Sequence, residues 1–185
     1  MKRLFIAIDL PFEIKEILNK YKEELAKYIT YGVKWVELEN LHFTIRFLGE
    51  TEENKIPDIQ RIMDEVSCEF FPFSISFNEL GAFPSFKNPR VIWIGIENGK
   101  REMKTLFQRL EDKIVKLGFQ REEKEFSPHL TLGRVKDKFR WEKEWKIDIP
   151  YLEFLAEEIT LFESKLTSKG PIYNSLYKSK FSKNI

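Results

Sequence analysis

Two short stretches of this chain repeat one pattern, and they constrain the fold more than any other feature. Residues 41–48 and 128–135 each contain a histidine, an apolar residue, a threonine and a second apolar residue, in that order. Side chains alternate between the two faces of a strand, so the His and Thr share one face and the apolar residues share the other. The pattern therefore predicts two half-buried strands that each carry an imidazole beside a hydroxyl. The chain contains only two histidines, His42 and His129, and each lies in one of these stretches.

The spacing of the two histidines recurs elsewhere in the sequence. His129 follows His42 by 87 positions (129 − 42), and Arg90 follows Arg3 by the same number (90 − 3), each arginine opening a buried apolar run. Each half then reads as a buried strand, an amphipathic helix and a histidine-bearing strand. A unit that occurs twice at one offset predicts two pseudo-symmetric lobes. If the lobes pack through their motif strands, the two imidazoles face a shared cleft.

Hydrophobic spacing predicts the other elements. Apolar residues at three- and four-residue intervals predict three helices, which follow Pro11 up to 28, span 56–66 and span 103–117. Residues 30–32 end the first helix and Gly118 ends the third. Apolar or alternating runs predict further strands at 4–8, 33–36, 70–80, 91–96, 152–166 and 173–181. The segments between them predict loops at 81–89 and 136–150, an edge strand or loop at 119–126 and a turn at 167–171.

Composition limits the class of protein. Hydrophobic content of 42% and aromatic content of 15% predict a real core and exclude disorder, and without a linker we expect 1–185 to form a single domain. Thirty-one Lys and Arg against 30 Asp and Glu give a net charge of +1, so a polyanion would have to bind in a local cationic pocket. The single cysteine, Cys68, has no partner for a disulfide or a thiol metal site. The first apolar run stops at Asp9 and no segment is long enough to span a membrane, so we expect a cytoplasmic protein.

Two imidazoles at one cleft can act as a general acid–base pair. Histidine titrates near neutral pH, so one ring can be neutral while the other is protonated. The neutral ring would take a proton from an attacking water, and the protonated ring would give one to a leaving oxygen. Each transfer is typically worth about 10²–10⁴-fold in rate. Thr44 and Thr131 would hold the oxygens of a tetrahedral anion such as a phosphodiester, because a hydroxyl both donates and accepts hydrogen bonds.

An arginine of the motif strands could neutralise the charge of that phosphate, since a guanidinium is a planar fork of fixed charge. Arg46 lies four positions after His42 and shares its face on a regular strand. Arg134 lies five positions after His129 and would point away, unless Gly133 marks a bulge that redirects the next side chain. Both arginines are therefore candidates, and a mere surface charge is the competing interpretation of Arg46.

Structural interpretations compete with the other functional ones as well. A histidine on a half-buried strand is usually structural, and threonine is an ordinary strand former; the matched contexts at one offset favour function for this pair. Two histidines without a neighbouring carboxylate pattern make a poor metal site, and there is no Gly-rich phosphate loop, so we expect neither metal nor cofactor. Some aromatic residues could stack on a nucleobase, although most of the 17 phenylalanines must form the core. The candidates are Trp35, Phe47, Phe83, Phe86 and Phe126.

At this point the sequence resembles a known group of enzymes. The paired motifs His42-Phe43-Thr44-Ile45 and His129-Leu130-Thr131-Leu132 resemble those of the 2H phosphoesterase superfamily. Their surroundings are similar to the RNA 2',3'-cyclic phosphodiesterase family, formerly called 2'-5' RNA ligase. The similar segments extend over nearly the whole chain, at 3–8, 41–50, 81–84, 128–134 and 170–173.

The resemblance implies a fold and a reaction. The fold would be α+β, with two pseudo-symmetric lobes, each an antiparallel sheet with outer helices, around a central groove. The family opens a terminal 2',3'-cyclic phosphate of RNA by water attack and leaves a 2'-phosphate, without a metal. By position in the motifs, His42 would be the proton donor to the departing 3' oxygen and His129 the proton acceptor from water. Thr44, Thr131 and Arg134 would bind phosphate oxygens.

Other functions stay open on the sequence. The reverse reaction, which joins RNA ends through a 2'-5' bond, uses the same two histidines by microscopic reversibility. A module that binds RNA ends without catalysis is a second alternative, and a purely structural domain is a third. The RNA partner would carry a 2',3'-cyclic phosphate terminus, as in a tRNA half or another oligonucleotide, and nothing in the sequence demands more than a monomer.

Overall fold

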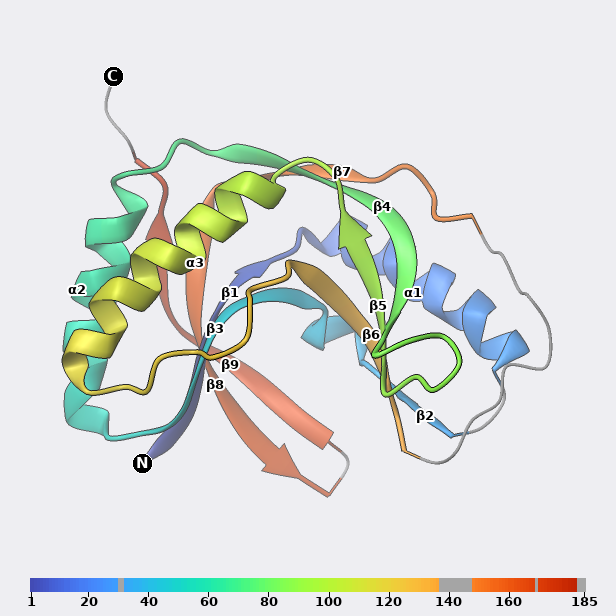
Figure 1. The fold of residues 1–185 in the computed structure, drawn as a ribbon, viewed down its shortest axis with the longest axis horizontal. Coiled ribbons are helices and arrows are strands. Elements are labelled where there is room, and N and C mark those ends of the chain that lie inside the picture. The colour runs from blue at the N-terminus through green and yellow to red at the C-terminus, as the bar shows by residue number, and fades with distance from the viewer. Residues whose placement is uncertain (30–31, 137–147, 169, 183–185) are drawn as a thin grey trace.

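The chain forms two antiparallel sheets in a computed structural model that describes residues 1–29, 32–136, 148–168 and 170–182 (Figure 1). The first sheet has the strand order β3 (His42–Thr51), β1 (Lys2–Asp9), β8 (Glu158–Thr167) and β9 (Gly170–Lys180). The second sheet has the order β2 (Val33–Trp35), β6 (His129–Val135), β5 (Val91–Ile96), β4 (Phe73–Phe83) and β7 (Glu153–Ala156). Each sheet thus contains one histidine-bearing strand, in agreement with the expected α+β fold of two lobes.

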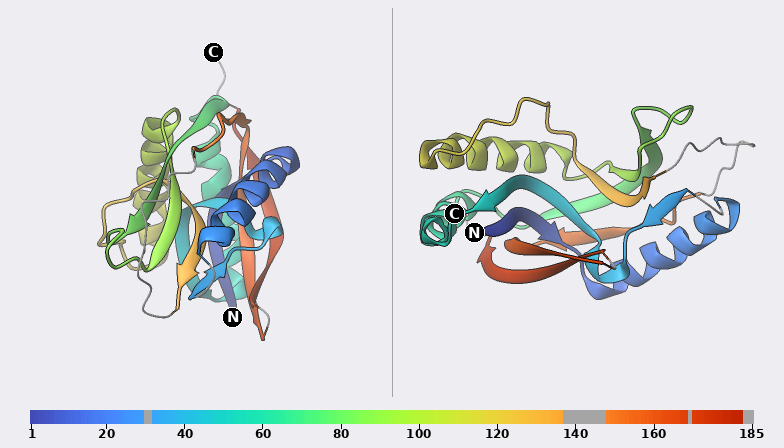
Figure 2. Two further views of the ribbon diagram at one scale, coloured as in Figure 1. Left: turned by 90° about the vertical axis from the view of Figure 1, so that its right-hand side faces the viewer. Right: turned by 90° about the horizontal axis from the view of Figure 1, so that it is seen from below.

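Within the described residues, three α-helices and three short 3-10 helices lie outside the sheets. They are α1 (Phe12–Tyr28), η1 (Leu38–Asn40), η2 (Glu53–Lys55), α2 (Ile56–Ser67), α3 (Lys100–Ile114) and η3 (Val115–Leu117). The helices α2 and α3 contact each other at one end of the molecule, and α1 lies at the other end (Figure 2). All three helices were predicted from the spacing of apolar residues, and the structure confirms them. None of the helices in the described ranges is long and apolar enough to cross a membrane.

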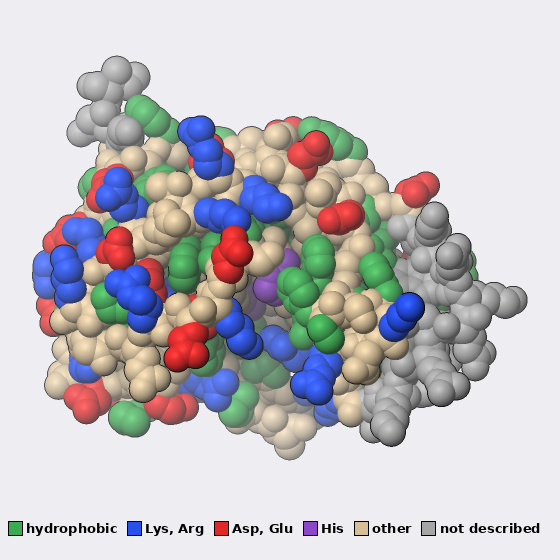
Figure 3. All heavy atoms as spheres, in the orientation of Figure 1, with side chains coloured by type: hydrophobic (Ala, Val, Ile, Leu, Met, Phe, Trp, Pro, Cys, Tyr) green, Lys and Arg blue, Asp and Glu red, His purple; other side chains and the backbone are tan. Residues whose placement is uncertain are grey.

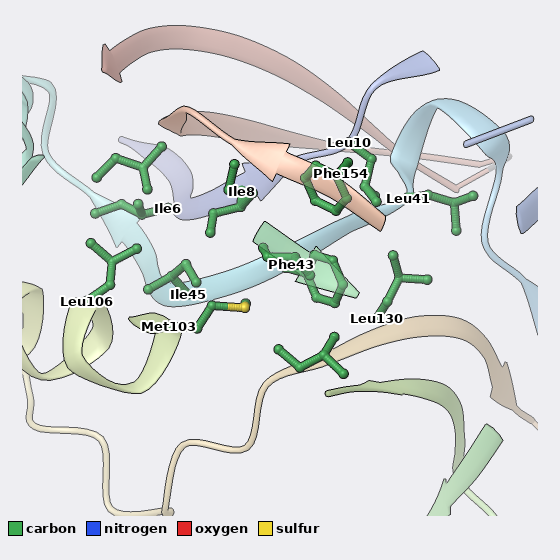
Figure 4. Close-up of a cluster of buried hydrophobic side chains, with 14 of the residues drawn as sticks. Ile6, Ile8, Leu10, Leu41, Phe43, Ile45, Met103, Leu106, Leu130 and Phe154 are labelled. Atoms are coloured by element: carbon green, nitrogen blue, oxygen red, sulfur yellow. The ribbon is translucent and has the colours of Figure 1, made fainter. Parts of the chain in front are cut away.

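One hydrophobic core joins the two sheets. It takes side chains from β1, β3, α3, β6 and β7, and Figure 4 shows Phe43 among Ile8, Leu130 and Phe154. Phe43 and Leu130 directly follow the two histidines, and both are fully buried. The apolar positions of the two motifs therefore point into the core that the lobes share, as strand alternation predicts.

Several element boundaries differ from the expected ones. The strand expected at 70–80 continues to Phe83, because Gly81 to Phe83 still pair with β5. The single strand expected at 152–166 is two strands, since the chain leaves the second sheet after Ala156 and enters the first at Glu158. Residues 119–126 contain no strand. The parts of the predicted helix end, loop and turn at 30–31, 137–147 and 169 lie outside the described residues.

Candidate active site

The two motif strands, β3 and β6, lie beside each other at the junction of the sheets (Figure 1). Each pairs with one equivalent neighbour, so that Ala7 of β1 lies opposite Thr44 and Trp93 of β5 lies opposite Thr131. These partners are 86 positions apart (93 − 7), one fewer than the motif strands. The repeated strand pairing is therefore confirmed. The strands β1 and β5 correspond at an offset of 86, however, so Arg3 and Arg90, which are 87 positions apart, are not at equivalent positions.

Both motif strands contain a β-bulge at the same place. In β3, Thr44 pairs with Ala7 and Arg46 pairs with Ile6, which leaves Ile45 without a partner. In β6, the pairing skips Leu132 in the same way, between the partners Trp93 and Ile92. A bulge inserts one residue and shifts the alternation of all that follow. The residue after each Thr-apolar pair is consequently buried, and the one after that is exposed.

The bulge overturns the expectation for Arg46, which was wrong. Its side chain points away from His42 and is only 6% exposed. There it forms a buried ion pair with Glu111 of α3 and donates to the backbone oxygen of Gln120. Arg46 fastens α3 and the following segment to β3, so it is not a phosphate ligand in this structure.

The bulge brings Arg134 to the face of His129, as a bulge marked by Gly133 would require. Gly133 occupies the position that Arg46 holds in the other motif (133 − 46 = 87). A Cβ at Gly133 would lie 2.7 Å from Val33 Cγ1 and 3.0 Å from Trp35, so glycine alone lets β2 pack this closely. The exposed Arg134 is thus the counterpart of the exposed Phe47.

The two imidazoles are held by the same kind of hydrogen bond. His42 Nδ1 donates to the backbone oxygen of Asn40 at 2.7 Å, and His129 Nδ1 donates to that of Ser127 at 2.7 Å. A carbonyl can only accept, so the proton of each neutral ring lies on Nδ1 and Nε2 keeps its lone pair. In His42 this Nε2 lies 2.8 Å from Thr44 Oγ1, whose hydroxyl donates to it. Each ring therefore has its basic nitrogen at Nε2.

Burial keeps both rings neutral in the free protein. It lowers the pKa of His42 from 6.5 to about 4, against the opposing effects of the Asn40 carbonyl and the Asp9 carboxylate. Burial also lowers the pKa of His129, and the Ser127 carbonyl opposes this shift. The charge of Arg134 lowers the pKa of both rings, so the guanidinium lies near both. Figure 3 shows histidine atoms in a depression bordered by hydrophobic side chains and by Lys and Arg side chains.

Aromatic rings pack against each imidazole. Tyr173 meets His42 edge-on with ring centroids 5.3 Å apart, and Phe5 lies 4.9 Å from His42. On the other side, Phe83 meets His129 edge-on at 5.1 Å and stacks on Trp93. Of the predicted stacking residues, Phe83 is therefore seen in contact with a histidine.

Three of the other predicted stacking residues have different neighbours. Phe126 stacks on Phe107, Trp35 packs against Gly133, and the ring of Phe47 lies under the guanidinium of Arg3. Phe5, Trp93 and Tyr173 were not among the residues predicted from the sequence. Strand alternation could have placed Phe5, because Leu4 and Ile6 on either side of it are core residues.

The site contains groups suited to acid–base chemistry on an anion: the two imidazole Nε2 atoms, the hydroxyls of Thr44 and Thr131, and the guanidinium of Arg134. In the described part of the chain, no three His, Cys, Asp or Glu side chains gather closely enough to hold a metal ion. The absence of a metal requirement stays a prediction. Asp9 was also missed; it lies opposite His42 in the β1–β3 pairing and forms an ion pair with Lys15 at 2.7 Å.

Comparison with known proteins identifies the relatives of the chain. The family model described as "LigT like Phosphoesterase" matches it twice, over residues 8–93 and 94–173, with one histidine motif in each match. A protein of Methanocaldococcus jannaschii named RNA 2',3'-cyclic phosphodiesterase is 40% identical over 92% of this chain and 96% of its own length. One of the same name from Thermotoga maritima is 41% identical over 97% and 95%. The crystal structure of TT0787 of Thermus thermophilus superposes with a TM-score of 0.83 at 28% identity, over 99% of this chain and all of that one.

Proposed function

The chain belongs to the LigT-like phosphoesterase family, and we propose that it hydrolyses the 2',3'-cyclic phosphate at the end of an RNA by acid–base catalysis between His42 and His129. Relatives that are about two-fifths identical over nearly their whole lengths are named for this activity. One observation carries the mechanism: the two imidazoles lie on matching bulged strands, and each has Nδ1 occupied by a main-chain carbonyl. This arrangement leaves Nε2 of each ring for proton transfer.

The reaction moves two protons in opposite directions. His129 Nε2 takes a proton from water as the water oxygen forms a bond to phosphorus. The bond from phosphorus to the 3' oxygen breaks, and protonated His42 Nε2 gives its proton to that oxygen. The products are a 3'-hydroxyl and a 2'-phosphate. The enzyme is left with His129 protonated and His42 neutral. The assignment of donor and acceptor follows the order of the motifs in the family.

The phosphate is held by side chains on the same two strands. Thr44 and Thr131 donate hydroxyl hydrogen bonds to its oxygens, and Arg134 supplies the positive charge for the charge that develops on them. The phosphate also affects the protonation of His42. The pKa of His42 is about 4 in the free protein, which disfavours the protonated form that a proton donor needs. A bound anion favours that form, so His42 becomes a proton donor when substrate is present.

The substrate we propose is any RNA with an accessible 2',3'-cyclic phosphate terminus, tRNA halves included. Ligation through a 2'-5' bond is the same reaction run backwards and needs no other catalytic group. Each lobe supplies one histidine and one threonine of the motifs, so neither lobe holds a complete site. Both come from one chain, and we therefore propose that residues 1–185 act as a single unit and as a monomer.

An oligoribonucleotide ending in 2',3'-cyclic phosphate tests the proposal directly. The purified protein is incubated with it in the presence of EDTA, and the 2'- and 3'-phosphate products are separated. We expect turnover to the 2'-phosphate alone, and a loss of about 10²–10⁴-fold in each of His42→Ala and His129→Ala.

Each other outcome favours a different function. Binding of the RNA with no turnover by the wild-type protein would favour a module that recognises RNA ends. Activity that EDTA abolishes would contradict the metal-independent mechanism. Turnover that survives in both histidine variants would remove these residues from the reaction.

A further inference from the structure

Arg3 is a second guanidinium beside the site, and the mechanism above does not use it. It belongs to β1, where Leu4 and Ile6 point into the core and Phe5 points to the face of His42. Alternation places Arg3 on the same face as Phe5. Its Cζ lies 5.0 Å from the ring centroid of Phe47, the exposed residue that follows the bulge of β3.

Two observations place Arg3 near the reacting groups. Its positive charge acts on the hydroxyl of Tyr173, and so does the charge of Arg134. The ring of Tyr173 in turn packs edge-on against His42. The two guanidiniums thus flank one tyrosine that borders the candidate proton donor.

The contacts of Arg3 leave it suited to an anion. It is half-buried, yet it forms no ion pair with a carboxylate in the described part of the chain. The Cζ of Arg3 lies over the ring of Phe47, and an aromatic ring face takes none of the guanidinium N–H donors as a carboxylate would. A partly desolvated charge without a partner is poorly compensated, and a phosphate fits the edge of a guanidinium with two parallel hydrogen bonds.

The chemistry of the substrate identifies that phosphate. A 2',3'-cyclic phosphate closes the 3' end of an RNA, so all remaining nucleotides are attached through the 5' oxygen of the terminal nucleoside. The first anion on that side is the adjacent phosphodiester. Phe47 pairs with Phe5 and Thr44 with Ala7, two positions apart on β1, so Phe47 lies roughly 7 Å along the sheet from Thr44, which matches the scale of one nucleotide.

We propose that Arg3, oriented by Phe47, binds the phosphodiester immediately 5' to the terminal nucleoside. This inference rests on the proposed function and names a specificity of the same site: an RNA end is preferred over a cyclic mononucleotide. We expect no preference for RNA longer than a dinucleotide, because a second upstream phosphate would meet no excess of positive charge. Beyond Phe47 lies a cavity of about 710 Å³ where the carboxylates of Glu50, Glu52, Glu122 and Glu123 offset an equal number of Lys and Arg side chains. This lining has no net positive charge for a further phosphate.

The test compares three substrates that share the cyclic end, two of which differ only in their upstream linkage. They are a 2',3'-cyclic mononucleotide, a dinucleotide with the same cyclic end, and that dinucleotide with an uncharged methylphosphonate linkage. In the wild-type protein we expect kcat/KM about tenfold higher for the charged dinucleotide than for either of the others, and no further gain from a trinucleotide. In Arg3→Gln the ratio of dinucleotide to mononucleotide falls about tenfold, and in Phe47→Leu it falls less.

The exposed Arg101 of α3 provides the matched control, since Arg101→Gln removes the same charge from a helix position outside the paired strands of the site. This variant keeps the wild-type ratio. Equal rates of the wild-type protein on charged and uncharged dinucleotides would overturn the proposal even if Arg3→Gln failed to fold. A ratio unchanged in folded Arg3→Gln would overturn it as well. Failure of the proposed function is distinct, because it appears as no turnover of any of the cyclic substrates.

Discussion

The two halves of the candidate site share their backbone and differ in their surroundings. In both, a carbonyl two residues before the histidine accepts from Nδ1, a threonine follows two residues after it, and a bulge follows the threonine. The residue opposite the histidine differs: Asp9 lies opposite His42, whereas Gly95 lies opposite His129. Duplicated backbone geometry thus presents two equivalent imidazoles, and unequal neighbours decide how each one holds a proton.

The sharpest contrast between the halves lies in the two arginines after the bulges. Arg134→Met is expected to lower kcat/KM by about 10²–10³-fold, since it removes the positive charge proposed for the phosphate, with little change in the free energy of unfolding. Arg46→Met leaves Glu111 buried without a partner and is expected to destabilise the protein by about 3–5 kcal/mol, with kcat/KM of the folded protein nearly unchanged. Steady-state kinetics and urea unfolding of both variants check this. Loss of activity without loss of stability in Arg46→Met would contradict the assignment.

The pH dependence of the reaction sharpens the comparison of the two rings. The profile of kcat/KM reports groups of the free enzyme, where burial lowers the pKa of His42 to about 4 and that of His129 below 6.5. We therefore expect the maximum below pH 6.5 and a fall of about tenfold per pH unit on the alkaline side. The profile of kcat lies at higher pH, because the phosphate raises the pKa of His42 in the complex. A maximum of kcat/KM near pH 8 or above would contradict two neutral imidazoles acting in these roles.

The smallest expected effect comes from the residue opposite His42. The carboxylate of Asp9 raises the pKa of His42 and Lys15 lowers it, so Asp9→Asn removes the favourable charge and leaves the unfavourable one. We expect kcat/KM to fall several-fold and its maximum to move to lower pH. The exposed Glu13 provides a control at the start of α1, and Glu13→Gln leaves the profile in place. A lower kcat/KM with no movement of the profile would mean that Asp9 acts through folding rather than through the proton of His42.

Local pattern accounts for the parts of the site that the sequence could predict. The alternation of His42 and Thr44 with buried Phe43 required only a strand, and the three helices required only their apolar spacing. The wrong face for Arg46 has a different cause, since nothing in Ile45 signals a bulge and only the second motif contains a glycine. The offset of 87 did contain a usable signal: it pairs Arg46 with Gly133, and Phe47 with Arg134.

Contacts between distant segments could not be predicted in the same way. Tyr173 reaches His42 through the pairing of β8 with β9 and of β8 with β1. Asp9 acts on the ring because the register of β1 against β3 places it opposite the histidine. Both depend on which strands pair and in which register, and spacing along the chain does not state this.

The hydrogen bonds from each Nδ1 to a main-chain carbonyl also affect how the enzyme regains its starting protonation state between turnovers. A ring whose Nδ1 is fixed cannot pass a proton from one of its nitrogens to the other, so it must release the proton from the same atom that received it. In the proposed reaction, His129 ends with a proton taken from water and His42 without the proton it gave to the 3' oxygen, so the enzyme is set to run the reaction in the opposite direction. It returns to its starting state only when solvent water carries one proton off His129 and brings another to His42. The entry of solvent water to the two histidines, between product release and binding of the next substrate, would then be a separate step of the catalytic cycle.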